Sequence, residues 1–229
     1  MTDLKQDHLH LLVEGAKQLG VQVSPAALAQ LTLYLEELLR WSPKIDLVSQ
    51  TDPAAIIRKH FLDSIAIAPL LPENATLLDL GSGAGFPGIP IAIALPHTAV
   101  SLVEARRKRV SFLKEVVRKA KTPNLMVYEG RAEVLAQQQD LLHHFSVVLT
   151  RATWHIDTFL HLAHPFLQPT GTALMMKGPQ LMKELHEWES SSQKHGFLLQ
   201  HRYRYVLPGS GEHREVVTFL KEDNVSRDT

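Results

Sequence analysis

The sequence predicts an α/β fold with a seven-stranded, mostly parallel sheet and a helical N-terminal extension. Apolar residues recur at helical spacing before residue 62. From Ala75 onward, short apolar runs alternate with amphipathic stretches, which is the pattern of parallel βαβ units. One apolar run ends in glycines at 81, 83 and 85, a turn that joins a strand to a helix around a nucleotide-like ligand.

The N-terminal part is expected to hold three helices. Apolar residues spaced three or four apart indicate the first helix over 9–19. Ser24 and Asp52 are each followed by proline, and an N-cap residue before proline predicts that a helix begins there. The stretch 41–50 is interpreted as a loop or extended link. Residues 1–70 are expected to form a helical extension that caps the sheet edge.

The remaining elements follow from the same periodicities. Strands are predicted at 76–80, 99–103, 124–128, 145–150, 171–176, 197–206 and 214–220. Helices are predicted at 87–95, 105–120, 132–143, 154–166 and 179–194. Only a short segment with Pro208 and Gly209 joins the last two strands, so they form a hairpin and the last strand is antiparallel.

Length and composition restrict the class of protein. The 229 residues suit one large domain with an extension, and we expect a sheet domain over 71–222 and a polar tail over 223–229. The chain has no cysteine, which excludes disulfides, thiolate metal sites and a cysteine nucleophile for pyrimidine C5 methylation. The N-terminus does not resemble a signal peptide and no apolar run spans a membrane, so we expect a cytoplasmic protein without membrane contact.

The glycine loop indicates which ligand is bound. A dinucleotide fingerprint would place its third glycine at 86, where this chain has Phe86. The pattern is instead Asp79-x-Gly81-x-Gly83-x-Gly85, which resembles motif I of the class I methyltransferases that bind S-adenosylmethionine (AdoMet). Asp79 is then expected to accept hydrogen bonds from the loop and the cationic methionine part. The alternative is an unrelated glycine-rich turn.

An acidic residue follows the second predicted strand. Glu104 lies about 20 residues past the glycines, where a carboxylate can accept hydrogen bonds from ribose hydroxyls. The alternative is an acidic residue that only stabilises the start of the next helix.

Several separated motifs extend this pattern. They are Asp46-Leu47-Val48-Ser49, Lys59-His60-Phe61-Leu62-Asp63-Ser64, Gly85-Phe86-Pro87-Gly88-Ile89-Pro90, Lys108-Arg109, Phe112-Leu113, Arg151-Ala152, Lys177-Gly178 and Glu212-His213-Arg214. Together they resemble the bacterial glucose-inhibited division protein B family, the small-subunit rRNA guanine-N7 methyltransferases. The resemblance covers about residues 34–221. It departs at Asp46, Val48 and Lys59, where the family has Asn, Thr and Arg, and at Arg214.

The resemblance implies a Rossmann-like class I methyltransferase fold and transfer of a methyl group from AdoMet to guanine N7 in the 530 loop of 16S rRNA. The partner would be 16S rRNA or the 30S subunit, and the protein is expected to be a monomer. The AdoMet contacts carried over are Gly81, Phe86, Ala132, Glu133 and Arg151. Glu133 could instead only stabilise the start of its helix.

The substrate side is expected to position the base without an acid–base pair. Guanine N7 carries a lone pair and no proton. The main requirement is therefore to align N7 with the methyl group of AdoMet. Thr150-Arg151-Ala152-Thr153 lacks the Asp/Asn-Pro-Pro-aromatic motif of amino-group methyltransferases. The candidates on this side are Arg151, Lys177, His60, Asp63 and Arg214. Arg151 could alternatively form only a salt bridge, Lys177 could be solvated, and His60 could belong to the core.

Three further features leave alternatives open. Trp154 could stack on a flipped base or belong to the core. Eight basic residues between 106 and 121, against the single acid Glu115, suit either an RNA-facing surface or a solvated helix face. The histidines lack the spacing of a metal site, so no metal is expected. The alternative functions are methylation of another RNA or a small molecule, and noncatalytic binding of AdoMet or RNA.

Overall fold

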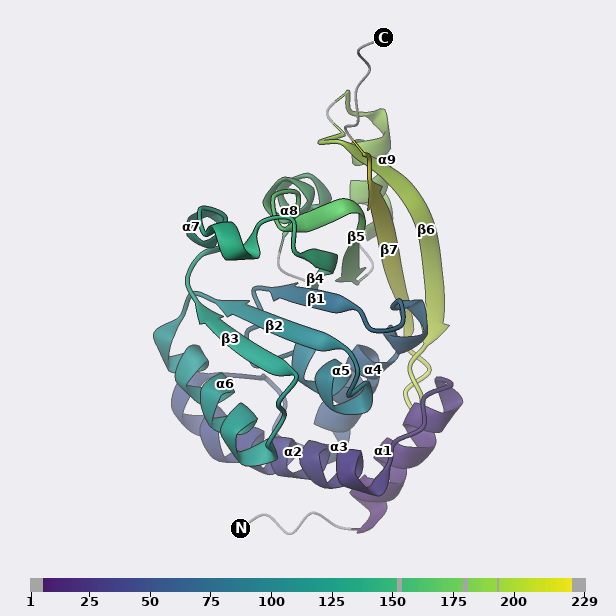
Figure 1. Cartoon of the computed structure of the whole chain (residues 1–229). Helices are drawn as coiled ribbons and strands as arrows, with labels where there is room; N and C mark the ends of the chain where they lie inside the picture. Colours follow the sequence, from purple (N-terminus) through teal and green to yellow (C-terminus); the bar gives the residue numbers. More distant parts are fainter. Residues whose placement is uncertain (1–5, 152–153, 179–180, 193, 224–229) are drawn as a thin grey trace.

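The computed structural model describes residues 6–151, 154–178, 181–192 and 194–223 (Figure 1). The helices are Gln6–Gln18 (α1), Pro25–Ile45 (α2), Pro53–Ile56 (α3), Asp63–Ile65 (α4), Gly88–Ala94 (α5), Arg107–Ala120 (α6), Ala132–Leu135 (α7), Ile156–Ala163 (α8) and Leu181–Ser190 (α9). A π-helix, Ile57–Leu62 (η1), joins α3 to α4, and 3-10 turns lie at Ala68–Leu70 and Gln139–Leu141. The strands are Thr76–Leu80 (β1), Ala99–Glu104 (β2), Leu125–Glu129 (β3), Phe145–Arg151 (β4), Leu167–Lys177 (β5), Phe197–Val206 (β6) and His213–Lys221 (β7).

The seven strands form one sheet in the order β3-β2-β1-β4-β5-β7-β6. The pairs from β3 to β5 are all parallel, whereas β7 is antiparallel to both β5 and β6. This confirms the predicted sheet with its antiparallel last strand. Because β1 lies between β2 and β4, the chain order reverses beside β1, and ligands of such sheets bind where the strands end at that point.

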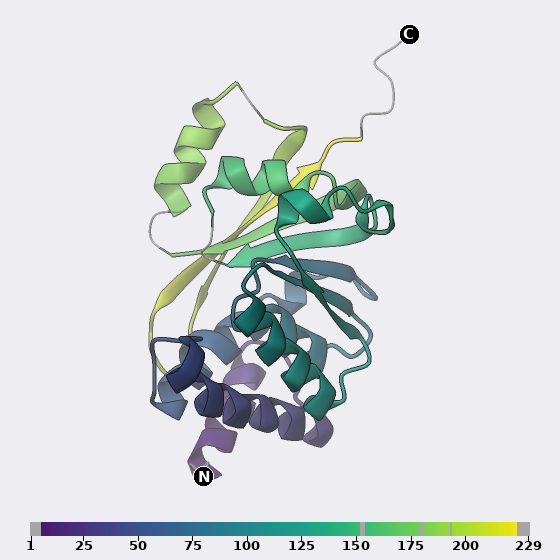
Figure 2. The same cartoon turned by 90° about the vertical axis from the view of Figure 1, so that its left-hand side faces the viewer.

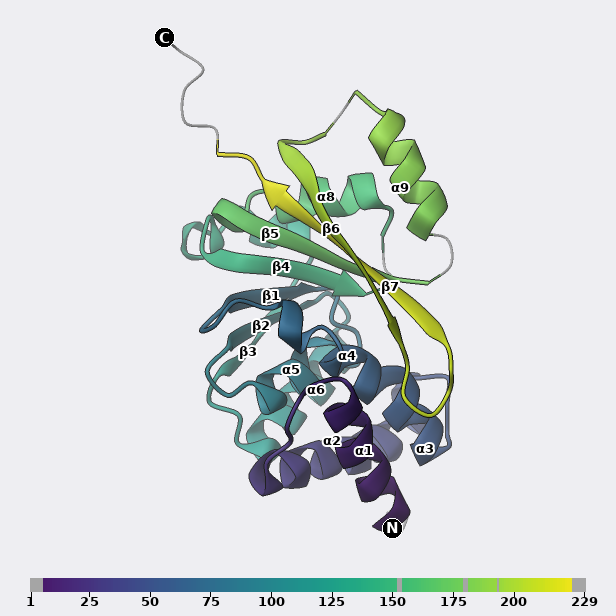
Figure 3. The same ribbon diagram turned by 90° about the vertical axis from the view of Figure 1, so that its right-hand side faces the viewer.

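Alternating residues of the strands belong to two separate cores. Leu77 of β1 joins the core that contains α1 to α6, and Leu78 joins the core that contains α7, α8 and α9. Helices thus cover both faces of the central strands, which explains why β1, β2 and β4 are mostly buried and apolar, whereas β6 at the sheet edge is largely exposed. Figures 2 and 3 show the two helical layers on opposite sides of the sheet.

The N-terminal helices pack over one face of the sheet rather than over its edge alone. Helix α2 contacts α5 and α6, and α4 contacts α5, so the extension forms a second layer beneath these helices. Both cap predictions are confirmed: the side chains of Ser24 and Asp52 accept hydrogen bonds from the backbone N–H of Ala27 and Ala55. In the part of the chain that the structure describes, no helix combines the length and apolar character needed to cross a membrane.

Several boundaries differ from the prediction, and three of the differences have a clear physical reason. Helix α2 continues through 41–45, because Trp41 packs edge-on against Phe112 and its indole donates to Glu37. The helix predicted over 132–143 is only α7 followed by a 3-10 turn, since the polar residues after Leu135 provide little apolar surface to bury. Strand β5 begins at Leu167 because Leu167 pairs with Phe145 of β4.

Candidate active site

The glycine loop after β1 is organised by the carboxylate of Asp79. Asp79 is fully buried, and its Oδ2 accepts a hydrogen bond of 2.9 Å from the backbone N–H of Gly88 at the start of α5. Burial raises the pKa of Asp79 to about 7, although the Gly88 hydrogen bond and nearby Arg151 oppose the increase. Its Oδ1 is buried without a hydrogen-bond partner among the described residues. This acceptor is not open to solvent, since Asp79 has no exposed surface.

The turn requires glycine for two reasons at Gly85. Its φ is +101°, in a region that side chains disfavour, and a Cβ there would lie 2.4 Å from Ile89 Cδ1. Gly81 and Gly83 also have positive φ values, of 67° and 59°. The loop therefore has the left-handed backbone angles that call for glycine at these positions.

Glu104 at the end of β2 holds the same loop from the other side. Its Oε2 accepts from the N–H of Gly83 at 2.9 Å, and its Oε1 accepts from the N–H of Arg106 at 2.7 Å. The carboxylate is buried, and the Arg109 guanidinium lies 4.0 Å away. Glu104 thus orders the loop and the start of α6, and each of its oxygens keeps a lone pair for a further donor.

The N-terminal extension forms one wall of the loop. Tyr34 of α2 is fully buried, and its hydroxyl donates a 2.7 Å hydrogen bond to the carbonyl of Ala84. Its ring lies 5.2 Å from that of Phe86, and the imidazole of His60 stacks on Phe86 at 5.0 Å. A pocket lies at this loop, and we call it the cofactor pocket after the ligand that the sequence predicts there. It is lined by Leu47, Val48, His60, Gly81, Ser82, Gly83, Ala84, Phe86, Arg109 and Arg151.

Ala132 and Glu133, predicted to meet adenine, begin α7 after β3. Strand β3 pairs with β2 so that Glu129 is in register with Glu104, which brings this segment to the same sheet edge as the loop. Ala132 is buried and Glu133 is exposed in the first turn of α7. Their contact with adenine stays a prediction.

Arg151 at the end of β4 connects the sheet to η1. Its Nη1 donates to the carbonyl of Lys59 and to Asp63 Oδ2, both at 3.2 Å, and its Nη2 lies 2.8 Å from His60 Nδ1. The guanidinium also lies over the ring of Phe86, 5.2 Å from the centroid. Arg151 therefore forms salt-bridge and cation–π contacts at the boundary of the cofactor pocket. Ala152, the next residue of its motif, lies outside the described residues.

His60 is held in one protonation state. Burial, together with the charges of Arg151 and Lys59, lowers the pKa of His60 to about 3. The imidazole is therefore neutral near pH 7, and its Nε2 lies 2.7 Å from Gln50 Oε1. Both ring nitrogens of His60 are therefore engaged, so neither is free to act as a base.

Asp63 is buried and joins three segments of the chain. Its Oδ2 accepts from Arg151, and its Oδ1 accepts a 2.7 Å hydrogen bond from the hydroxyl of Tyr205 in β6. Arg214 Nε of β7 lies 3.5 Å from the same Oδ1. Burial, reinforced by this carboxylate, raises the pKa of Tyr205, so the phenol stays a donor. Arg214 also donates to Glu212 at 2.6 Å. The structure thus joins four of the five substrate-side candidates in one network of hydrogen bonds and ion pairs.

Lys177, the fifth candidate, lies at the end of β5 and is already paired. Its ammonium donates to the carbonyl of Trp154 at 3.0 Å and to the buried carboxylate of Glu184 in α9. Trp154 is half-buried and packs against the core around α8.

A second pocket lies beside the cofactor pocket. We call it the substrate pocket; it is lined by Gln50, Lys59, His60, Asp63, Arg151, Met176, Lys177, Gly178, Tyr205, Arg214 and Glu215. His60 and Arg151 line both pockets, so the two are contiguous. A methyl donor bound at the glycine loop and an acceptor base in the second pocket would meet at these residues. Within the described ranges, no group of three or more His, Asp and Glu side chains is placed to hold a metal ion.

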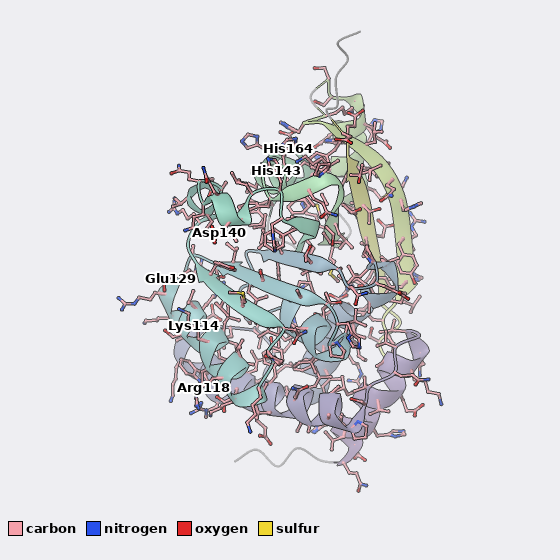
Figure 4. All side chains as sticks on the ribbon, in the orientation of Figure 1. Lys114, Arg118, Glu129, Asp140, His143 and His164 are labelled. Carbon is pink, nitrogen blue, oxygen red and sulfur yellow. The ribbon has the colours of Figure 1, made fainter. Side chains whose placement is uncertain are left out.

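The basic residues around α6 divide into two groups. Glu115 and Glu37 pair with Arg118, Lys119 and Arg40, which neutralises the C-terminal part of the helix. Arg106, Arg107 and Lys108, at its N-terminal end, are exposed beside Arg109 of the cofactor pocket. Figure 4 labels Lys114 and Arg118 on the outer side of the helix.

The sequence reasoning missed Tyr34, Gln50 and Tyr205. Tyr34 and Tyr205 could have been found, since each places a hydroxyl among residues whose spacing predicts a buried face. A buried tyrosine hydroxyl usually has a hydrogen-bond partner. No sequence signal singled out Gln50.

Solved structures confirm the fold. A SAM-dependent methyltransferase from Aquifex aeolicus superposes with a TM-score of 0.55 and 18% identity, over 74% of this chain and 94% of that one. TYW2 from M. jannaschii, solved in complex with AdoMet, superposes with a TM-score of 0.53 and 18% identity. The match covers 70% of this chain and 74% of that one. These similarities establish the class I methyltransferase architecture.

Sequence relatives are more specific. A protein of Desulfotalea psychrophila named ribosomal RNA small subunit methyltransferase G is 36% identical over 92% of this chain and 97% of its own length. A protein of the same name from Myxococcus xanthus is 35% identical over 92% of this chain and 96% of its own. The family model described as "GidB: rRNA small subunit methyltransferase G" matches residues 27–207. The chain therefore belongs to the GidB family of AdoMet-dependent rRNA small subunit methyltransferases.

Proposed function

We propose that this protein transfers the methyl group of AdoMet to N7 of a guanine in the 530 loop of 16S rRNA. The choice of N7 rests on one observation. The two titratable groups best placed to act as a base, His60 and Asp63, are already bonded to neighbouring side chains. Both nitrogens of His60 and both oxygens of Asp63 are held by hydrogen bonds or ion pairs. Guanine N7 carries no proton, so such a site is sufficient, whereas an amino group would require a proton acceptor.

In this proposal, catalysis is mainly alignment. AdoMet supplies an electrophilic methyl group, and in-line placement of two reactants can contribute about 7–11 kcal/mol. Asp79, Gly81, Gly83, Gly85, Phe86 and Glu104 would hold the cofactor, with Ala132 and Glu133 at adenine. Arg151 would fix the boundary between cofactor and base, supported by Asp63. The exposed basic end of α6 would contact RNA phosphates.

The position in the 530 loop comes from the resemblance of the separated motifs, and the substrate form would be 16S rRNA or the 30S subunit. We propose that residues 1–70 act as an integral wall of the site on the domain 71–222, since Tyr34, His60 and Asp63 all come from the extension. The tail beyond Asp223 lies outside the described residues.

The test is to incubate the enzyme and labelled AdoMet with 30S subunits or 16S rRNA that lack the modification, and to map N7-methylguanine by chemical cleavage. We expect one cleavage, in the 530 loop. The Arg151→Ala variant provides the control for a contaminating activity, and it should lose the signal. Label at another nucleotide or at an exocyclic amine would replace the proposed acceptor.

A further inference from the structure

A directed chain of hydrogen bonds links Arg151, His60 and Gln50. The guanidinium of Arg151 can only donate, so the Nδ1 atom of His60, 2.8 Å away, must be the acceptor. The imidazole is neutral, because its pKa is lowered to about 3, and its proton therefore resides on Nε2. Nε2 lies 2.7 Å from Gln50 and donates to it, which fixes the carbonyl oxygen Oε1 of the amide as the acceptor.

The orientation of the Gln50 amide follows from this chain. With Oε1 used by His60, the amide presents its NH₂ group to the remaining space. Gln50 Nε2 has no hydrogen-bond partner among the residues that the structure describes. Gln50 is half-buried and lines the substrate pocket, so two donors are available to a ligand there.

Gln50 lies beside the boundary between the cofactor pocket and the substrate pocket. His60, its hydrogen-bond partner, lines both the cofactor pocket and the substrate pocket. A base whose N7 faces the methyl donor also turns its C6 substituent toward this boundary, because N7 and the C6 substituent share one edge of a purine. That substituent is the acceptor O6 in guanine and the donor amino group in adenine.

We propose that Gln50 is a specificity residue of the substrate pocket, whose amide N–H donates to guanine O6 and rejects the amino group of adenine. A free glutamine amide can bind the adenine edge with its oxygen and nitrogen together. Here Oε1 is directed to His60, so the NH₂ group is the part of the amide left to face the pocket, and a base with an acceptor at C6 is matched. This inference rests on the proposed function and adds a reason for its choice of purine.

The experiment uses 16S rRNA carrying one of three bases at the mapped target. Guanine has O6, 2-aminopurine lacks O6 but keeps N7, and inosine keeps O6 but lacks the 2-amino group. Methyl-transfer kcat/KM is measured for the wild type, Gln50→Met and Gln50→Glu. The control is Thr51→Val at the exposed neighbouring position, and AdoMet affinity is measured by calorimetry.

We expect the wild type and Thr51→Val to prefer guanine over 2-aminopurine by about tenfold, the contribution of one hydrogen bond at the upper end of the usual range. Gln50→Met should reduce this preference to within about twofold, with unchanged AdoMet affinity and an unchanged guanine-to-inosine ratio. Gln50→Glu should lower the guanine-to-2-aminopurine ratio below that of Gln50→Met, because a carboxylate would then face the O6 atom of guanine.

If Gln50→Met keeps the preference for guanine over 2-aminopurine while the wild type methylates the guanine RNA, the role of Gln50 is overturned and the proposed function stands. Absence of transfer to guanine by the wild type overturns the proposed function, and this inference with it.

Discussion

The hydroxyl of Tyr34 donates a 2.7 Å hydrogen bond to the carbonyl oxygen of Ala84, which lies 50 residues away in the glycine loop. The contact joins helix α2 to the loop expected to hold AdoMet, and both partners are buried. Burial raises the pKa of Tyr34 well above its usual value, so the hydroxyl stays protonated at any working pH. The helical extension is thus hydrogen-bonded directly to the glycine loop.

Tyr34→Phe should weaken AdoMet binding by roughly fivefold, since it leaves the buried carbonyl of Ala84 without its donor. RNA affinity, measured by filter binding, should be unchanged. Leu31→Ala is the matched control, because it truncates a fully buried residue of the same helix that lies outside the cofactor pocket. Equal AdoMet affinity of Tyr34→Phe and wild type in calorimetry would show that the loop keeps its shape without this bond.

Glu104→Ala should weaken AdoMet binding at least about tenfold. The substitution removes the proposed ribose acceptor and two charge-assisted hydrogen bonds that order the loop and the start of α6. Glu104→Gln keeps a single carbonyl acceptor and should fall between Ala and the wild type. The ribose role would not survive a calorimetric affinity that equals the wild-type value in both variants.

Asp63→Asn should lower kcat by more than about 30-fold while AdoMet affinity changes less than about threefold. The change removes the negative charge that holds the guanidinium groups of Arg151 and Arg214. Tyr205→Phe leaves that charge and removes only the 2.7 Å hydrogen bond, so a three- to tenfold decrease in kcat is expected. Single-turnover rates measured well below each variant's melting temperature separate this effect from unfolding. A loss of AdoMet affinity in proportion to the rate would place Asp63 on the cofactor side.

His60 should make the protein less stable as the pH falls from about 6.5 toward 3. The unfolded chain takes up a proton near the ordinary histidine pKa, whereas burial and two nearby cations lower the folded pKa to about 3. Between these values the unfolded state binds more protons, and one such group changes the unfolding free energy by at most about 1.4 kcal/mol per pH unit. The stability is fully present above the unfolded pKa and decreases on acidification. His60→Gln should therefore show a shallower decrease in urea midpoint from pH 8 to pH 5 than the wild type, and parallel curves would contradict the assignment.

Reversing the exposed charges of Arg107 and Lys108 to Glu should weaken RNA binding and make it less sensitive to salt. Each lost phosphate contact should reduce the slope of log K against log salt by about 0.7 for single-stranded RNA. Lys17→Glu on the exposed surface of α1 is the control for a charge reversal away from this end of α6. A salt slope equal to that of the wild type would remove this end of α6 from the RNA surface.

The fold was predictable because its signals are local. The period of the strands, the hairpin with Pro208 and Gly209, and the caps at Ser24 and Asp52 depend on neighbouring residues, and the structure confirms each. The end of α2 was not predictable in the same way. Its continuation through Trp41 depends on Phe112, which is brought there only by the packing of α2 on α6.

The sequence by itself determined the glycine loop after β1, since the spacing of Gly81, Gly83 and Gly85 reflects backbone angles that only glycine adopts easily. It also identified Arg151 and Lys177 as residues at strand ends. Only the tertiary structure decided how these side chains are used. Asp63 meets Tyr205 across 142 residues, and Arg151 meets His60 across 91, because sheet order and helix packing bring distant segments together. Partners that far apart leave no periodicity in one sequence, so hydrogen-bond direction and charge pairing appear only in the folded chain.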